Sequence, residues 1–404
     1  MKWEKVKLGN VCEITSSKRI FYSEYVDDGV PFYRSKEIIE SDGGKVIENP
    51  LYISVDKYNE IKEKFGVPQT GDMLLTSVGT IGISYIIKKK DCFYFKDGNL
   101  TWFRNFREGL NSKYLYYWIK SSEGTGILYN TTIGSSQKAL TISALKNIKV
   151  SLPPRSVQDK IVEVVSAYDD LIENNQKQIK LLEEAAQRLY KEWFVDLRFP
   201  GHENTKIVDG VPEGWSKSTV SEVSAILRRG ISPKYNEKAR GIVINQKCIR
   251  QTIVSYDEAR TQEKKYPDEL KMMESDILIC STGAGTLGRI GQIFEAKENV
   301  TLDSHVTLIR ANERVGQQYL FWSLKMQQDY LMSAGKGSTN QLELSRETIG
   351  NCEILVPERK IAEQAEKNFV AIHNKMKECS MQIARLREAR DLLLPNLMSG
   401  EVEA

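Results

Sequence analysis

Apolar side chains recur at alternating steps of three and four residues between Leu152 and Pro200. The series consists of Val165, Tyr168, Ile172, Asn175, Ile179, Leu182, Ala186, Leu189 and Trp193. Such spacing keeps the side chains on one face of a helix and describes a coiled-coil seam. Asn175 is the polar exception, and a polar residue in a seam fixes register and partner at some cost in stability.

Prolines mark both ends of this segment. Pro153 and Pro154 stop the preceding strand, and Pro200 with Gly201 stops the helix. We therefore predict one long helix over 152–200, which for about 40 residues is roughly 60 Å long. A rod of this length in mid-chain separates the segments on either side of it.

The same seam occurs a second time, since Val165 matches Phe369 at a shift of 204 residues. The matching positions are Phe369, Ile372, Met376, Cys379, Ile383, Leu386, Arg390, Leu393 and Leu397. The seam could serve homodimerisation, but the duplication favours pairing inside one chain. We predict an antiparallel helix pair with a pseudo-twofold axis, whose contacts include Ile172, Asn175, Ile179, Leu182, Leu189, Met376, Cys379, Ile383, Leu386 and Leu393. Asn175 would face Cys379 or be bound by a partner.

The segments before the two rods also match each other. Residues 71–79 correspond to 275–283, and 97–104 correspond to 303–310. Short β-rich runs punctuated by Gly and Asp dominate both, with one short helix expected at 112–120 and another at 317–328. The predicted fold class is α+β, with two β-rich units separated by two long antiparallel helices. The expected boundaries are 1–151 and 201–355 for the units, and 152–200 and 356–404 for the helices.

Composition narrows the class of protein only slightly. The net charge is +3, which neither indicates nor excludes a nucleic-acid binder with clustered basic residues. The chain has no apolar run of about 18 residues, and its first residues lack the apolar region of a signal peptide, so we expect a cytoplasmic protein. The six cysteines form no C-x-x-C pair and are read as reduced thiols, and the three histidines share no metal-ligand spacing.

Catalytic motifs are weak or incomplete. Gly283–Gly288 spells G-x-G-x-x-G after a strand, but a dinucleotide site needs a helix next, and the following residues are β-like. A glycine-punctuated β-turn is the better interpretation. The letters of a PD…(D/E)xK nuclease at 267–271 place the carboxylates side by side rather than on separate strands. Catalysis inside this chain is therefore disfavoured.

Polar and basic clusters recur at equivalent places in the two β-rich units. Arg suits guanine edges and Asn or Gln suits adenine, whereas Lys, Ser and Thr suit phosphate. Each residue taken singly is better explained by a solvated loop, and the recurrence is what favours a binding surface. The candidate DNA-binding residues are Lys18, Arg19, Arg34, Lys36, Ser77, Thr80, Gln137, Lys138, Arg228, Arg229, Gln246, Lys247, Thr282, Thr286, Arg289, Asn340 and Gln341.

Four short stretches resemble one known family, the specificity (S) subunits of type I restriction-modification systems. They are the L-P-P-x-x-x-Q entry at Leu152–Gln158, the L-Y-x-x-W-F-V-D exit at Leu189–Asp196, the V-P-E-G-W start at Val211–Trp215, and the closing L-L-P-N-L-M-S-G-E at Leu393–Glu401. The resemblance covers nearly the whole chain.

The resemblance implies a non-catalytic DNA-recognition subunit. Each β-rich unit would be a target recognition domain that reads one half of a bipartite sequence, and the helices would set the gap and dock two methyltransferase (M) subunits. Those partners would carry S-adenosylmethionine and methylate adenine at N6, and restriction (R) subunits would use ATP and Mg to cut. This chain would hold no metal and no cofactor. The alternative is a protein- or carbohydrate-binding scaffold with a coiled-coil spacer.

Overall fold

The computed structural model describes residues 3–44, 47, 49–134, 138–283, 285–335 and 342–402. The chain forms two compact units. Unit 1 comprises Met1–Asn174 with Ile383–Ala404, and unit 2 comprises Asn175–Gln382. The boundary between them falls inside both long helices, so each unit contains part of each helix.

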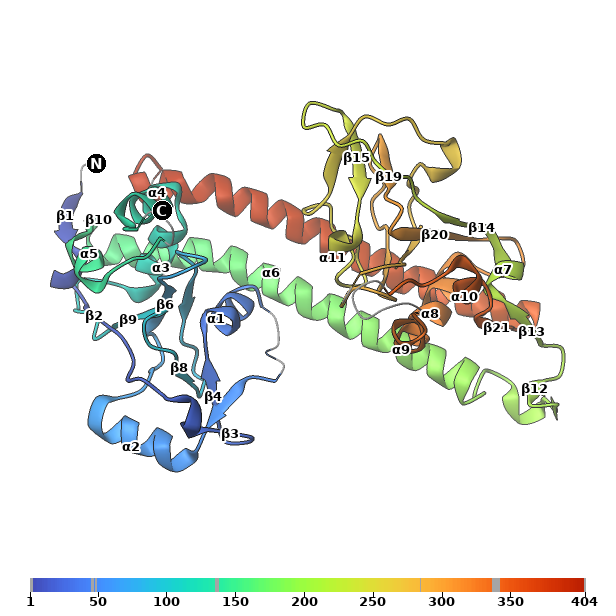
Figure 1. Ribbon diagram of the computed structural model, residues 1–404, viewed down its shortest axis with the longest axis horizontal. Helices are drawn as coiled ribbons and strands as arrows, with labels where there is room; N and C mark the ends of the chain where they lie inside the picture. The colour runs from blue at the N-terminus through green and yellow to red at the C-terminus, as the bar shows by residue number, and fades with distance from the viewer. Residues whose placement is uncertain are drawn as a thin grey trace. The chain divides into compact units, whose positions relative to one another are not determined.

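Unit 1 is built on two four-stranded sheets (Figure 1). The first is antiparallel, in the order β2 (Glu13–Thr15), β9 (Leu100–Arg104), β6 (Met73–Thr76) and β7 (Ser84–Ile86). The second has the order β3 (Tyr25–Val26), β5 (Leu51–Ile53), β4 (Val30–Tyr33) and β8 (Tyr94–Phe95), with β4 parallel to β8. A separate pair joins β1 (Glu4–Lys7) to β10 (Lys149–Leu152). The short helices are α1 (Ser35–Asp42), α2 (Val55–Phe65), α3 (Ser112–Lys120), α4 (Ser122–Thr131) and α5 (Ile142–Asn147).

Unit 2 repeats this topology, except that its second sheet has three strands instead of four. Its antiparallel sheet has the order β14 (Ser224–Arg229), β20 (Val306–Ala311), β17 (Ile277–Cys280) and β18 (Ile290–Gln292). A second sheet has the strand order β16 (Arg260–Gln262), β15 (Gly241–Ile244) and β19 (Val300–Leu302), with β15 parallel to β19. Two pairs complete it, β13 (Ser216–Thr219) with β21 (Glu353–Val356) and β11 (Ile207–Val208) with β12 (Val211–Pro212). Its short helices are α7 (Val220–Val223), α8 (Gln317–Met326), α9 (Gln328–Ser333) and α10 (Arg346–Gly350).

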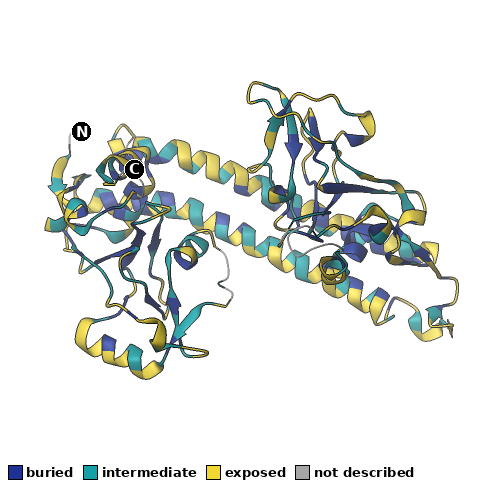
Figure 2. Ribbon diagram, viewed as in Figure 1, coloured by how far each residue is buried: buried dark blue, intermediate teal, exposed yellow. Residues whose placement is uncertain are grey.

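The cores contain the residues that the sequence pattern assigns to them. Strands β6 and β17 are buried along their whole length. The dark ribbon in Figure 2 shows this burial for β6, which Figure 1 labels. The aromatic side chains of the two short predicted helices are also buried: Tyr114 and Trp118 on α3, and Tyr319 and Trp322 on α8. Each tyrosine donates its hydroxyl to a backbone carbonyl near the strand that enters a long helix, Tyr114 to Ser151 and Tyr319 to Leu355. These aromatic side chains therefore belong to the cores of the two units.

The two long helices are α6 (Arg155–Tyr190), which continues as a π-helical turn over Lys191–Val195, and α11 (Arg359–Ser399). Helix α6 is shorter than the predicted span of 152–200. Leu152 still belongs to β10, and the two prolines after it cannot donate backbone hydrogen bonds to a helix. The chain leaves the helix before Pro200, at a turn that places Leu197 at φ +56°.

Helices α6 and α11 run antiparallel, as contacts within each unit show. In unit 1 the first turns of α6 share a core with the last turns of α11, through Val165 and Leu397 among others. In unit 2 the end of α6 packs with the beginning of α11, as in the cluster that contains Ala186 and Phe369. The α+β fold class with two long antiparallel helices and an internal repeat is confirmed.

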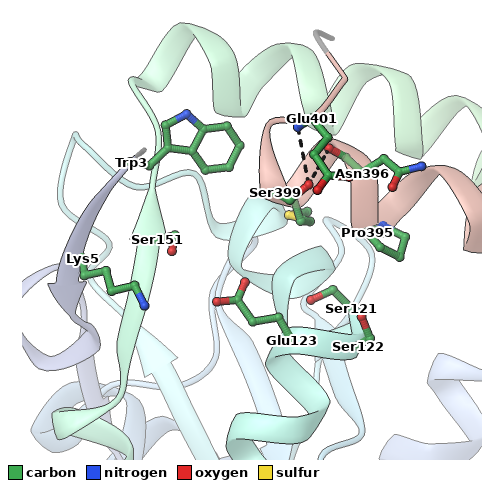
Figure 3. A pocket seen from close by; sticks show the side chains of 11 residues that line it. Trp3, Lys5, Ser121, Ser122, Glu123, Ser151, Pro395, Asn396, Ser399 and Glu401 are labelled. Atoms are coloured by element: carbon green, nitrogen blue, oxygen red, sulfur yellow. Dashed lines mark hydrogen bonds between the residues drawn. The ribbon is translucent and has the colours of Figure 1, made fainter. Parts of the chain in front are cut away.

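The first and the last described segments of the chain meet in unit 1. The ring of Trp3 lies against Gly400, where a Cβ atom would come within 2.8 Å of it. Figure 3 shows Trp3 beside Asn396, Ser399 and Glu401 at the rim of a hollow of about 520 Å³. Trp215 has the corresponding place in unit 2, with its ring centroid 4.6 Å from that of Phe199. The two tryptophans that begin the halves of the sequence therefore tie each unit to the end of a long helix.

Candidate nucleic-acid interface

Three segments far apart in the sequence come together after strand β6 of unit 1. Ser77 donates its backbone N–H to the carbonyl of Asn99 (2.8 Å) and accepts from Leu140 N–H (2.9 Å). Val78 forms a β-bridge with Ala139. These bonds hold the loop after β6, the residue before β9 and the segment before α5 as one surface, which we call the platform of unit 1.

Unit 2 builds the same platform after β17. Ser281 donates its N–H to the carbonyl of His305 and accepts from Leu344 N–H, both at 2.8 Å. Thr282 forms the bridge with Glu343 that corresponds to Val78 with Ala139. Because all three connections recur, the platform belongs to the duplicated fold rather than to one local loop.

A buried pair of hydroxyls lies beneath each platform. Ser77 Oγ is 2.6 Å from Thr101 Oγ1, and Ser281 Oγ is 2.6 Å from Thr307 Oγ1. All four residues are at most 3% exposed. The candidate residue Ser77 therefore supports the platform from inside, where its hydroxyl does not reach the surface.

The platform of unit 1 borders a hollow of about 510 Å³. Lys36 and Thr80, both predicted from sequence, line it together with Ser35, Val78 and Asn99. Lys36 and Thr80 are exposed. The structure thus brings two predicted residues, 44 positions apart, to one concave surface.

The platform of unit 2 carries a hydrogen-bond network instead. Gln246 Nε2 donates to the carbonyl oxygen of Thr282 (2.6 Å) and to Thr282 Oγ1 (2.7 Å). Thr282 Oγ1 also lies 2.7 Å from Nδ1 of His305, and Thr286 Oγ1 donates to the Thr282 carbonyl (3.1 Å). Three of the predicted residues, Gln246, Thr282 and Thr286, therefore meet in one cluster.

The remaining candidates in unit 1 lie apart from the hollow or are engaged. Lys18 is exposed, with its ammonium 4.3 Å from the Phe65 ring centroid, and Arg19 pairs with Asp97 at 2.9 Å. Arg34 pairs with Glu37 (2.7 Å) at the start of α1. Burial acts to raise the pKa of Glu37, but hydrogen bonds from the Arg34 side chain and backbone lower it overall. The exposed Lys138 stacks on Tyr129, and Gln137 lies outside the described residues.

In unit 2 two candidate arginines are paired with acids. Arg228 contacts Glu269 at 2.5 Å, and Arg229 contacts Glu343 at 2.6 Å. Arg229 also donates to the Leu344 carbonyl and so braces the platform. Lys247 is exposed and Arg289 is half-buried, whereas Asn340 and Gln341 lie outside the described residues.

Two residues of the platforms, Asn99 and His305, are missing from the candidates predicted from the sequence. A signal for both was available, since the match of 97–104 with 303–310 places Asn99 opposite His305. Polar residues at equivalent positions of a repeat were the clue. Next to His305, burial raises the pKa of Asp303, which accepts the His305 backbone N–H at 2.9 Å and stiffens this turn.

The helix seam has the expected apolar character. Ile172, Asn175, Met376, Cys379 and Ile383 are buried, and a second group is half-buried: Ile179, Leu182, Leu189, Leu386 and Leu393. Asn175 is 6% exposed and engaged in an interaction. Cys379 Sγ lies 3.6 Å from Gln178 Oε1, so Gln178 provides a polar contact in the seam.

The stretch Gly283–Gly288 forms the connection between β17 and β18. The chain continues into a strand, where a dinucleotide site would require a helix, so the β-turn interpretation is confirmed. The short stretch Asp268–Leu270 is a 3-10 turn. The described part of the chain has no cluster of three or more His, Cys, Asp or Glu side chains placed to hold a metal, and no described helix is long and apolar enough to span a membrane.

Two copies of one sheet-rich unit, each with a polar platform and each containing part of an antiparallel helix pair, define a duplicated recognition protein. The chain belongs to the type I restriction-modification DNA specificity family, whose domain model matches residues 1–184 and 212–373. The predicted function of DNA recognition by two domains is confirmed by this match.

Individual relatives agree with the family. The MjaIX specificity subunit of Methanocaldococcus jannaschii is 26% identical over 99% of this chain and 93% of its own length. The HindI specificity subunit of Haemophilus influenzae is 25% identical over 65% of this chain and 71% of its own. The crystal structure of the S subunit of a type I system from M. genitalium shares the fold, with a TM-score of 0.57 and 16% identity, over 98% of this chain and 96% of that one.

Proposed function

We propose that this chain is the DNA-recognition subunit of a type I restriction-modification complex and that each platform reads one half of a bipartite target. The observation that carries the proposal is the duplication of the platform, with its three matching backbone connections, in two units whose surface residues differ. Equal scaffolds with unequal side chains suit two half-sites of unequal sequence. Major-groove base edges are the features that such side chains can distinguish.

The chain would act without catalysis of its own. Two methyltransferase subunits would dock on the long helices, bring S-adenosylmethionine and methylate a flipped adenine at N6 in each half-site. Restriction subunits with ATP and Mg would cut unmodified DNA. The family membership supports these partners, and a cytoplasmic location follows from a DNA target. The scaffold alternative has no support from the relatives described above.

The helix pair would set the gap between half-sites. A test is to insert seven residues into α6 after Gln178 and seven into α11 after Cys379, because these two side chains are in contact and a paired insertion keeps the seam aligned. One heptad adds about 10 Å, or roughly three base pairs. Mapping of N6-methyladenine in cells that carry the wild-type or the lengthened chain reports both targets.

The expected result is two unchanged half-sequences separated by the longer gap. An unaltered target in a folded, methylating complex would refute the spacer role. A single seven-residue insertion in α6 alone serves as the control, since it leaves the two helices unequal and should abolish methylation. Binding to random duplex DNA should weaken steeply with salt, whereas a protein-binding or carbohydrate-binding scaffold would show no such slope.

A further inference from the structure

The hydrogen bonds on the platform of unit 2 determine which way the Gln246 amide points. Gln246 Nε2 lies 2.6 Å from the carbonyl oxygen of Thr282, and a carbonyl can only accept a hydrogen bond. The amide nitrogen must therefore face Thr282, and the amide oxygen Oε1 faces away. Among the described residues Oε1 has no hydrogen-bond donor, and the Gln246 side chain is half-buried.

The Thr282 hydroxyl also contacts His305. Thr282 Oγ1 accepts from Gln246 Nε2 (2.7 Å) and also lies 2.7 Å from His305 Nδ1, where the hydroxyl donates in one imidazole tautomer and accepts in the other. A neutral imidazole that accepts at Nδ1 carries its proton at Nε2. His305 is exposed, so in this tautomer its Nε2–H is a donor available to a ligand. Gln246 Nε2 and His305 Nδ1 each lie 2.7 Å from Thr282 Oγ1, so this one oxygen links the two side chains.

Gly283 makes room for this arrangement. Its φ is +103°, and a Cβ atom there would lie 2.9 Å from Gln246 Nε2 and 2.4 Å from Thr286 Oγ1. A side chain would push the amide away from Thr282. The glycine that the sequence offers as part of a nucleotide-binding motif thus has a different use.

Unit 1 has no such network at the equivalent positions. Val78 and Asn99 take the places of Thr282 and His305, and together with Ser35 they line the hollow of about 510 Å³. Valine has no hydroxyl to link its neighbours. The two platforms therefore present different patterns of donors and acceptors on the same backbone frame.

Building on the proposed function, we propose that Gln246 and His305 read an adenine in the major groove of the half-site bound by unit 2. His305 Nε2–H donates to purine N7, and Gln246 Oε1 accepts from the N6 amino group. Adenine presents this acceptor and donor together, whereas guanine presents two acceptors at the same positions. Thr282 acts as a positioning residue that orients both side chains.

The test is selection of preferred targets from a random DNA library, with the full chain in complex with its methyltransferase subunits. The variants are His305→Ala, Gln246→Ala and Thr282→Val, which has the residue of unit 1. Each should reduce the preference for adenine at one and the same position, by roughly 5- to 150-fold for the two direct readers. The other half-site should stay unchanged. Asn99→Ala is the matched control and should alter only the half-site bound by unit 1.

Modified DNA tests which atom of the adenine His305 contacts. Replacing the selected adenine by 7-deazaadenine removes N7 and should weaken wild-type binding as much as His305→Ala does, with no further loss when the two are combined. Additive losses, or an unchanged preference in the three variants, would overturn the assignment to Gln246 and His305. If the wild-type complex selects no bipartite sequence at all, the proposed function itself has failed.

Discussion

Arg390 on α11 donates to Asp169 on α6 across 2.6 Å, and both residues belong to unit 1. The other oxygen of Asp169 accepts from the hydroxyl of Tyr117 on α3 at 2.8 Å. One carboxylate therefore links the two long helices to the sheet-rich part of the unit. Seam position Arg390, where the heptad pattern expects an apolar residue, has this ionic role instead.

Removing the guanidinium should loosen the helix pair. Arg390→Met roughly keeps the length of the side chain but removes its hydrogen bond to Asp169, which then keeps only the hydrogen bond from Tyr117. Since the two charged groups are 26% and 32% exposed, we expect a loss of about 1–2 kcal/mol in the free energy of unfolding of unit 1. Hydrogen exchange of α6 and α11 amides measures it. Arg385→Ala, at an exposed position of the same helix, should change exchange little, and equal effects of the two variants would contradict the role of the ion pair.

His373 should make the stability of unit 2 sensitive to acid. The side chain is 4% exposed, its Nδ1 lies 3.0 Å from Gln292 Oε1, and its Nε2 is buried without a described partner. Burial lowers its pKa to about 4, with opposing influences from Glu274 and Lys377, which pair with each other at 2.7 Å. A protonated ring would be a charge in an apolar place against Phe294.

The sign follows from linkage. In the unfolded chain a histidine has a pKa near 6.5. Between about pH 6.5 and 4 the unfolded chain therefore binds a proton at His373 that the folded unit does not bind, and unfolding takes up this proton. Stability should fall as the pH drops through this window and level off below it. His373→Phe removes the titration, so the pH slope of its unfolding free energy should differ from wild type by about one proton. Parallel pH profiles would show that His373 is not responsible.

Two glycines with the same backbone conformation should respond very differently to alanine. Gly288 and Gly210 both have φ +74°, but a Cβ on Gly288 would lie 2.5 Å from the backbone nitrogen of Met332, whereas nothing lies within 4 Å of one on Gly210. The left-handed conformation alone costs roughly 1–2 kcal/mol. Gly210→Ala should lose about that much, and Gly288→Ala roughly 3 kcal/mol or more because α9 must move. Denaturant unfolding compares them, and similar losses would mean that the contact with α9 is easily relieved.

Exposed lysines on the platforms should contribute to the salt dependence of DNA binding. Lys36 borders the hollow of unit 1, and Lys247 lies next to Gln246 in unit 2. Changing either one to alanine should reduce the slope of log K against log salt by about 1, with the selected sequence unchanged, if each contacts a phosphate. Lys64→Ala is a control, because that lysine is outside the lining of the hollow and its ammonium pairs with Glu60 at 3.0 Å, closer than Lys36 to Glu40 at 3.9 Å. An unchanged slope for Lys36→Ala and Lys247→Ala would place the phosphates elsewhere.

The amino-acid sequence by itself determined the long helices, the repeat and the buried strands. These features depend on periodicity: the three-four spacing around Ile172 and Met376 selects a helical seam, and continuous apolar runs such as β6 select buried strands. The shift of 204 residues placed the loops after β6 and β17 in correspondence. The candidate list also contained Gln246, Thr282 and Lys36 because such residue types recur at equivalent places.

Only the tertiary structure decided what those candidates do. Ser77 and Thr80 are three residues apart and share one loop, yet one lies under the platform and the other on it, because strand pairing turns Ser77 toward Thr101. Gln246, Thr282 and His305 form one network although up to 59 residues separate them. Periodicity describes local repeats, whereas these contacts depend on how β15, β17 and β20 are brought together. The orientation of the Gln246 amide, on which the proposed readout depends, follows from that packing.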